Sequence, residues 1–253
     1  MAIGKINSLV LSSVAKVNSL AKSSMAKLNS LANVTFSNTK SIDLDGVNDH
    51  MTANGAGNDM DGNTGTISIW IKLDSISANA VPIKASVDSN NQVGFTYLNS
   101  SNKMRYVYKA GGSTKKVDHS VSIENDGNWH HIAITWDSSA DELKAYLDGS
   151  QVGSTIGSLG SWSGTIGDVV IGKNSVANNA YWKGHLDQVS VFTSVIAIGT
   201  LYNSGTVPNL TGTSNMVGWW QMEEGSGTSI ADDSGNSNTG TLVNGTTFAS
   251  DVA

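Results

Sequence analysis

The chain has 253 residues, of which 14% are charged and none is cysteine, so disulfides and cysteine-ligated metal sites are excluded. Its 27 glycines, together with many Ser, Thr and Asn residues, are typical of short strands joined by tight turns. No apolar run approaches the roughly 18 residues of a transmembrane helix, so we expect no membrane span.

The net charge of −6 is unevenly distributed along the chain. Residues 1–33 hold four lysines and no acid, so the remaining residues carry −10. An acidic body disfavours nucleic acid as a partner. The lysines also interrupt any apolar stretch of a signal peptide, so we expect no secretory signal and folding in the cytosol.

The first 33 residues contain an eleven-residue repeat, in which Lys-x-Asn-Ser-Leu begins at Lys5, Lys16 and Lys27. Eleven residues fill three helical turns, which keeps an apolar stripe on one face of a helix. Such a helix needs a partner in water. We therefore predict that residues 2–32 form a helix that self-associates, for instance as a trimer, or docks on a larger assembly. Asn-Ser pairs are poor helix formers, so an extended arm and a disordered tail remain alternatives.

Residues 34–253 contain several segments in which apolar and polar residues alternate, the pattern of half-buried strands. In the segment 66–73, we expect Ile67, Ile69, Ile71 and Leu73 to face one side and Trp70 the other. Residues 128–136 and 142–149 form a predicted hairpin, and residues 92–98 and 103–109 form a second one.

These motifs resemble the concanavalin A-like lectin/glucanase superfamily, in particular its laminin-G-like (pentraxin-type) domains. Trp129-His130-His131-Ile132-Ala133 and the strand ending in Leu147-Asp148-Gly149 resemble the signature hairpin. Residues 41–51 resemble the opening strand, and residues 166–172 and 181–192 resemble a later pair of strands. The resemblance implies an all-β fold, a two-sheet antiparallel jelly-roll sandwich, behind the helical or extended N-terminal arm.

One motif lies out of its usual order. Residues 217–242 resemble a stretch that in the family precedes the opening strand. Either the domain is circularly permuted, with residues 215–248 completing the sandwich, or these residues begin a second copy. We favour permutation, because a severed copy would leave an exposed sheet edge. The predicted domains are therefore residues 1–33 and 34–253.

The sequence gives little indication of catalysis. Glucanases of this fold place their carboxylates in a Glu-x-Asp-x-x-Glu run, which is absent here. The pairs Glu223-Glu224 and His130-His131 are the nearest candidates, but adjacent strand residues point to opposite faces. We predict a non-enzymatic protein.

The loop 232–238 has the Asp, Asn and Ser composition of a calcium loop. The resemblance implies a structural Ca²⁺ held by Asp232, Asn236, Asn238 and, from a neighbouring strand, Asp187. The alternative is a loop whose side chains satisfy their own backbone. A second acidic group, at residues 43–49, is interpreted as a solvated edge and turn.

Sugar sites combine an aromatic platform with a few polar side chains. Of the seven tryptophans, Trp162 lies in a Gly-Ser loop and Trp182 follows Asn178, Asn179 and Tyr181. We predict that these five residues bind glycan. The alternative is that the tryptophans cap the end of a sheet.

The N-terminal repeat resembles those of structural and decoration proteins of marine phages. The expected function is a non-enzymatic virion protein, a decoration or fibre component that displays a lectin-like jelly roll for glycan adhesion. Its partners would be further copies of the chain or capsid proteins, bound through residues 1–33, and surface glycans. The alternative is a bacterial cell-surface carbohydrate-binding adhesin module. A glycoside hydrolase is a third and less favoured hypothesis.

Overall fold

The computed structural model describes residues 36–253, and residues 38–253 form one compact unit. The helix, arm and oligomer predictions for residues 1–33 lie outside the described residues and stay predictions. Within residues 36–253, no helix has the length and apolar character needed to cross a bilayer.

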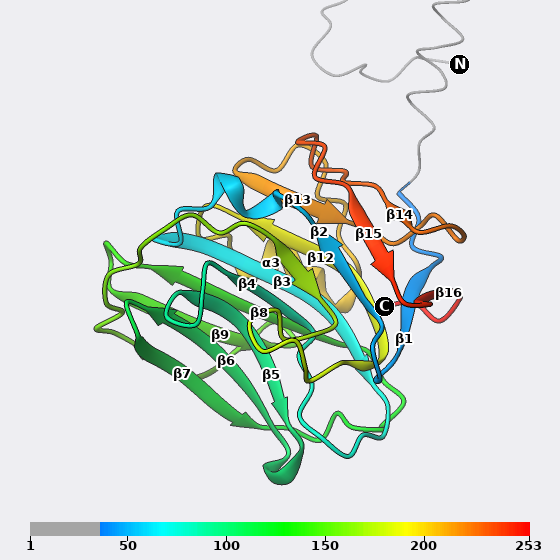
Figure 1. The fold of residues 1–253 in the computed structure, drawn as a ribbon, viewed down its shortest axis with the longest axis horizontal. Coiled ribbons are helices and arrows are strands. Elements are labelled where there is room, and N and C mark those ends of the chain that lie inside the picture. The colour runs from blue at the N-terminus through cyan, green and yellow to red at the C-terminus, as the bar shows by residue number, and fades with distance from the viewer. Residues whose placement is uncertain (1–35) are drawn as a thin grey trace, which may run out of the picture. The chain divides into compact units, whose positions relative to one another are not determined.

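The unit consists of two antiparallel sheets (Figure 1), which confirms the predicted all-β sandwich. The first sheet has the order β10 (Ser150–Ile156), β9 (Glu142–Leu147), β8 (His130–Asp137), β3 (Thr64–Leu73), β12 (Lys183–Phe192), β1 (Ser41–Asp45) and β16 (Thr247–Ala249), and β13 (Met216–Trp220) also pairs with β12. The second has the order β14 (Ser229–Ile230), β15 (Gly240–Val243), β2 (His50–Ala53), β11 (Val169–Ile171), β4 (Ile83–Ser86), β5 (Gln92–Leu98), β6 (Lys103–Ala110) and β7 (Ser113–Ser120). The helical segments are short: η2 (Ala56–Asp59), η3 (Asn99–Ser101), α3 (Ile198–Tyr202) and η4 (Asn203–Gly205).

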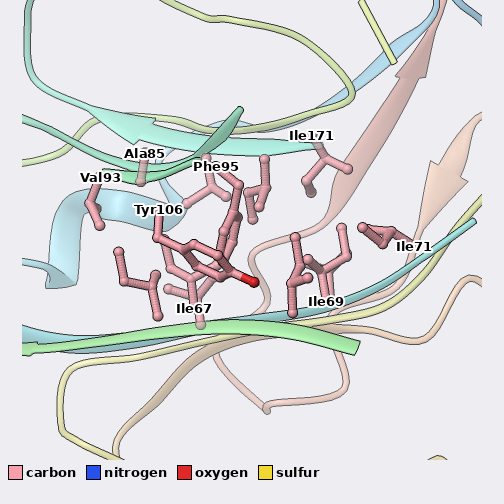
Figure 2. Packing of buried hydrophobic residues seen from close by; sticks show 14 of the residues in the cluster. Ile67, Ile69, Ile71, Ala85, Val93, Phe95, Tyr106 and Ile171 are labelled. Atoms are coloured by element: carbon pink, nitrogen blue, oxygen red, sulfur yellow. The ribbon is translucent and has the colours of Figure 1, made fainter. Parts of the chain in front are cut away.

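The core lies between the two sheets and follows from the alternation in the sequence. Ile67, Ile69 and Ile71 of β3 are fully buried, as predicted. Figure 2 shows them on the side of β3 that faces Phe95, Tyr106 and Ile171 of the opposite sheet. Because successive strand residues face opposite sides, the intervening positions of β3 form the outer face.

That outer face is partly covered by α3. Trp70 of β3 stacks on Tyr202 of α3, with ring centroids 5.9 Å apart, and is 5% exposed. The predicted orientation of Trp70, away from the isoleucines, is therefore confirmed.

The C-terminal residues contribute strands to both sheets. Trp220 of β13 is paired with β12, Leu242 of β15 with β2, and Phe248 of β16 with β1. In Figure 1 the red strands β15 and β16 accordingly lie beside the blue strands β2 and β1. Residues 216–249 are thus part of the same sandwich as the opening strands, whereas their origin by circular permutation stays a prediction.

Truncation of Trp220 tests whether the C-terminal strands are part of the core. Its side chain is fully buried, and its Nε1 donates to the carbonyl of Asn238 at 2.8 Å. We expect Trp220→Ala to lower the free energy of unfolding by about 3–5 kcal/mol, because it leaves a cavity. Urea unfolding measures the loss. Val195→Ala, at a side chain that is 50% exposed, is the control; equal effects of the two changes would contradict the placement.

Candidate functional site

A cleft of about 570 Å³ opens at the end of the sandwich where β1, β3 and β11 end and β4 and β12 begin. We call it the loop cleft. It is formed by three segments that are far apart in the sequence, and it is lined by Asp45, Gly46, Ser75, Ile76, Ser77, Ala78, Asn79, Ala180, Tyr181 and Lys183. The lining is mostly polar, with Tyr181 as its aromatic side chain.

Backbone hydrogen bonds fix the two longer segments of the loop cleft to each other. The N–H of Val81 donates to the carbonyl of Ala180 at 2.9 Å, and the N–H of Gly172 to the carbonyl of Pro82 at 2.7 Å. The N–H of Asp74 donates to the carbonyl of Lys183 at 3.1 Å. Because these bonds satisfy backbone groups on both segments, the cleft walls are held without a ligand.

The third wall is a tight turn after β1. Asp45 accepts a hydrogen bond from the N–H of Val47 at 2.7 Å, which holds the pKa of this carboxyl below its usual range. Gly46 has a φ of +78°, and a Cβ there would lie 2.7 Å from Cβ of Lys183. Glycine therefore permits both the turn and the close approach of β12. Since Asp45 and Lys183 are cross-strand partners, an acid and a base meet at the rim of the cleft.

Tyr181 is half-buried and lies against His50 of β2, with ring centroids 6.4 Å apart at an angle of 55°. Tyr181 is one of the five predicted glycan residues, and it lines the loop cleft. Asn178 and Asn179 are exposed in the same segment, residues 172–182. Asn178 accepts a hydrogen bond from Nζ of Lys173 at 2.8 Å.

The two predicted tryptophan platforms are buried, so the exposure on which that prediction depends is absent. Trp162 is 8% exposed, lies 5.5 Å from Tyr108 between ring centroids, and donates to the carbonyl of Gly164. Its indole packs directly on the backbone of Gly62, where a Cβ would overlap the ring. Trp182 is 0% exposed and belongs to the core cluster. Both indoles pack in the interior, which agrees with the structural alternative.

A second cleft, of about 450 Å³, is lined by Tyr97, Asn102, Val121, Ser122, Glu124, Asn125 and Asp126. We call it the Glu124 cleft. One oxygen of Glu124 accepts from the Tyr97 hydroxyl at 2.8 Å, and the other from the N–H of Ile76 at 2.9 Å. Burial and Glu124 together raise the pKa of Tyr97 to about 12. Because Ile76 lines the loop cleft, Glu124 connects the two clefts.

The carboxylates considered for catalysis have structural partners. Glu223 accepts from the N–H groups of Thr39 and Lys40 and from the Thr39 hydroxyl, and Glu224 accepts from the N–H of Ala231 at 2.7 Å. In the Glu124 cleft, Asp126 lies 3.0 Å from Nε2 of His130.

The adjacent histidines occupy different environments, as expected for neighbours on a strand. His130 is half-buried and bonds to Asp148 at 2.8 Å, which raises the pKa of His130. His131 is fully buried, lies 2.7 Å from the Ser68 hydroxyl, and has its pKa lowered by burial to about 4.

The four predicted calcium ligands fall into two hydrogen-bond networks. Asp232 accepts from the N–H groups of Trp219, Ser234 and Asn238 at 2.9–3.0 Å. The side-chain amides of Asn236 and Asn238 donate to the carbonyls of β13. The loop side chains therefore satisfy backbone groups of the loop itself and of β13. Within residues 36–253, no group of three or more His, Asp or Glu side chains is arranged to hold a metal ion.

Asp187 lies in the other network, on β12. It is fully buried, and its Oδ2 accepts from Nδ2 of Asn38 at 3.0 Å and from the N–H of Ala253 at 3.2 Å. Burial raises the pKa of Asp187 to about 7. The side chain therefore bonds to both ends of the compact unit, and the geometry gives a shared calcium site no support.

Comparison with known proteins gives a match between residues 45–197 and the family described as the concanavalin A-like lectin/glucanases superfamily. Over 84 residues, 33% of the chain, the sequence is 31% identical to the Rattus norvegicus protein "Sushi, von Willebrand factor type A, EGF and pentraxin domain-containing protein 1". The chain covers 2% of the length of that protein.

Three solved structures share the fold. A putative carbohydrate binding protein from Bacteroides ovatus has a TM-score of 0.60 at 15% identity, over 85% of this chain and 60% of that chain. The SAP-like pentraxin from Limulus polyphemus has a TM-score of 0.52 at 17% identity, over 81% and 94%. The Ruminococcus gnavus IT-sialidase CBM40 bound to α2,3-sialyllactose has a TM-score of 0.52 at 12% identity, over 68% and 100%.

The buried carboxyl of Asp187 predicts an unusual dependence of stability on pH. Between its ordinary pKa of 3.8 and its raised pKa of about 7, the folded chain keeps a proton that the unfolded chain has released. The free energy of unfolding of the wild type should therefore fall, relative to Asp187→Asn, as the pH rises through this window. The difference changes by at most about 1.4 kcal/mol per pH unit.

Urea unfolding at several pH values measures this difference. Asp118→Asn is the control, because Arg105 lowers the pKa of Asp118. Its contribution to stability is lost only as the pH falls below the ordinary pKa of 3.8, so it should produce no fall in stability between pH 4 and 7. Parallel pH profiles for the wild type and Asp187→Asn would contradict the assignment of a proton to Asp187.

Calcium binding at the loop 232–238 stays a prediction with a simple signature. A bound ion stabilises the folded state, so the melting temperature should be higher in Ca²⁺ than in EDTA, and Asp232→Asn should remove the difference. Differential scanning calorimetry measures it, with Mg²⁺ as the control cation. Equal melting temperatures in Ca²⁺ and EDTA count against the site.

Proposed function

The chain belongs to the concanavalin A-like lectin/glucanase superfamily, and from this premise we propose that residues 36–253 act as a non-enzymatic carbohydrate-binding module. The observation that carries the proposal is the loop cleft, where an aromatic ring meets charged and amide side chains in a prearranged concavity. Sugar sites need this combination, because a pyranose ring presents both an apolar C–H face and a set of hydroxyl groups.

Each part of the loop cleft has a role in this proposal. The ring of Tyr181 packs against the C–H face of a sugar, and its position is fixed by His50. The carboxylate of Asp45 accepts hydroxyl hydrogens, and Lys183 and Asn79 donate to hydroxyl oxygens. The rigid walls limit the ordering cost of binding.

Two observations support binding rather than hydrolysis, although the superfamily also contains glucanases. Two of the structures that share the fold are named as a carbohydrate binding protein and as a CBM40 domain. In addition, Glu124, Glu223 and Glu224 accept hydrogen bonds from the backbone and so serve the fold. Retaining hydrolysis needs two carboxyl groups about 5 Å apart on either side of the sugar bond.

For the biological setting, the names of the structural relatives support the carbohydrate-binding part of the alternative, a bacterial adhesin module, over the virion protein. Its place at a bacterial cell surface stays a prediction. Display on a phage particle depends on the repeat in residues 1–33 and stays a prediction. In either setting, several copies held together would combine weak sugar contacts by avidity.

Removal of the Tyr181 ring tests the proposal. A glycan array probed with the wild type identifies a ligand, and Tyr181→Ala should weaken its binding about tenfold or more, because the ring is the central aromatic contact. Isothermal titration calorimetry measures the affinity. Tyr146→Ala, a half-buried tyrosine on β9, is the matched control and should leave the affinity unchanged.

Two outcomes would overturn the proposal. One is the absence of binding to all glycans by the folded wild type. The other is release of reducing sugars that is lost in Glu124→Gln, which would indicate a hydrolase that works in the Glu124 cleft.

A further inference from the structure

The outer face of the second sheet carries a concentration of positive charge. Along β6, Met104, Tyr106 and Tyr108 point into the core and are 0% exposed. The alternate residues of β6, and their partners on β4 and β7, therefore point outward. We call the outward cations of these strands the basic face; they are Lys84, Lys103, Arg105, Lys109 and Lys116.

Strand pairing places these cations in a grid. Lys84 of β4 is paired with Gly94, Gly94 with Val107, and Val107 with Lys116 of β7. Lys84 and Lys116 are three strand spacings apart, about 14 Å. Lys109 lies one outward position along β6 from Val107, and Arg105 one position the other way. The positive charges thus surround the centre of β5 and β6.

Few acids neutralise this face, although residues 34–253 carry a net charge of −10. Asp118 is the acid within β4–β7, and it pairs with Arg105 at 2.7 Å and Lys116 at 3.4 Å. Asp88, in the turn after β4, interacts with Lys109. The face therefore keeps an excess of cations on an acidic body, which attracts anionic partners.

Lys84, on the β4 side of the basic face, is a buried cation without an anion. Its side chain is 6% exposed, and its Nζ donates to Oε1 of Gln92 at 2.8 Å, while no ion pair involves it within the described part of the chain. A buried charge that lacks a counter-charge is unfavourable. Burial, and then the charge of Lys109, lowers the pKa of Lys84 to about 8.

The strand next to Lys84 also lacks a side chain at the position opposite it. Gly94, its cross-strand partner, has no side chain, and a Cβ there would lie 2.4 Å from the carbonyl oxygen of Ile83. A side chain is therefore excluded at this position, so β5 places no side chain beside Lys84 there.

We propose that the basic face binds a polyanionic polysaccharide, one that carries sulfate or carboxylate groups, with an anionic group of the polymer placed at Lys84. This surface is separate from the loop cleft, and the proposal stands independently of a neutral sugar bound there. Nucleic acid is the less suitable polyanion, because the outward positions of β4–β7 hold no Phe, Tyr or Trp on which bases could stack. Ser86, Gln92 and Thr96 instead offer hydroxyl and amide groups to sugar hydroxyls.

The experiment uses the full chain and two polymers, dextran sulfate for sulfate groups and polygalacturonate for carboxylates, with uncharged dextran as the reference. We expect the chain to bind at least one of the charged polymers, with an affinity that falls as salt is added. The double variant Lys109→Gln/Lys116→Gln should bind about tenfold more weakly. The control Lys40→Gln/Lys144→Gln makes the same charge change elsewhere and should change the affinity less than about twofold.

A second measurement on the wild type keeps the test independent of folding defects. In lysine ¹³Cε NMR spectra, the polymer should shift the signals of Lys84, Lys109 and Lys116 and leave Lys144 unaffected. The proposal is overturned if neither charged polymer binds, if both double variants lose affinity equally, or if single-stranded or duplex DNA binds as tightly as the better polymer. Tyr181→Ala should keep the polyanion affinity, so failure here and failure at the loop cleft are distinguishable.

Discussion

The backbone pairing of β12 is the interaction on which the rest of the structure depends. One edge of β12 is hydrogen-bonded to β3, and the other is shared by β1 for its first half and β13 for its second half. The opening strand and the C-terminal segment therefore meet on one strand. The register shift after Asp187 bends β12 at the point where they meet, and Asp187 bonds to residues from both ends of the unit. Because β12 begins at Lys183 and β1 ends at Asp45, the same pairing sets the wall of the loop cleft.

Local pattern was sufficient to predict many of the strands, but not β4, β7 and β10. The single strand expected at residues 41–51 was wrong, because the turn after Asp45 divides it into β1 and β2, which belong to different sheets. The alternation of apolar residues in segment 66–73 gives both the existence of β3 and the face it buries, because the period of a strand is two residues. The hairpin predicted at residues 128–149 corresponds to β8 and β9 for the same reason. The neighbours of these strands in space could not be derived in this way. The pairing of β15 with β2 joins residues almost 200 positions apart, and alternation contains no information about such pairs.

The candidate site was only partly predictable for a related reason. Tyr181 was selected because it is an aromatic residue beside asparagines, and it does line the cleft. Asp45 was interpreted as a solvated turn, since nothing local shows that the segment 74–82 lies beside it. Trp162 was expected to be exposed because it lies in a Gly-Ser loop. It is buried instead, because the glycine at position 62 lets the indole pack onto the backbone. The basic face could not be predicted from the sequence, because its cations come from three strands and the net charge of residues 34–253 is negative.

The hydrogen bond between Asn38 and Ala253 determines where a larger assembly can be attached to the module. Nδ2 of Asn38 donates to the carbonyl of Ala253 at 3.1 Å, so the chain enters and leaves the sandwich at one place. From there β1 runs five residues, roughly 17 Å, before it reaches Asp45 at the loop cleft. A partner joined at either end of residues 38–253 would therefore be attached beside the middle of β12, on the flank of the sandwich, and the loop cleft would stay clear of the joint.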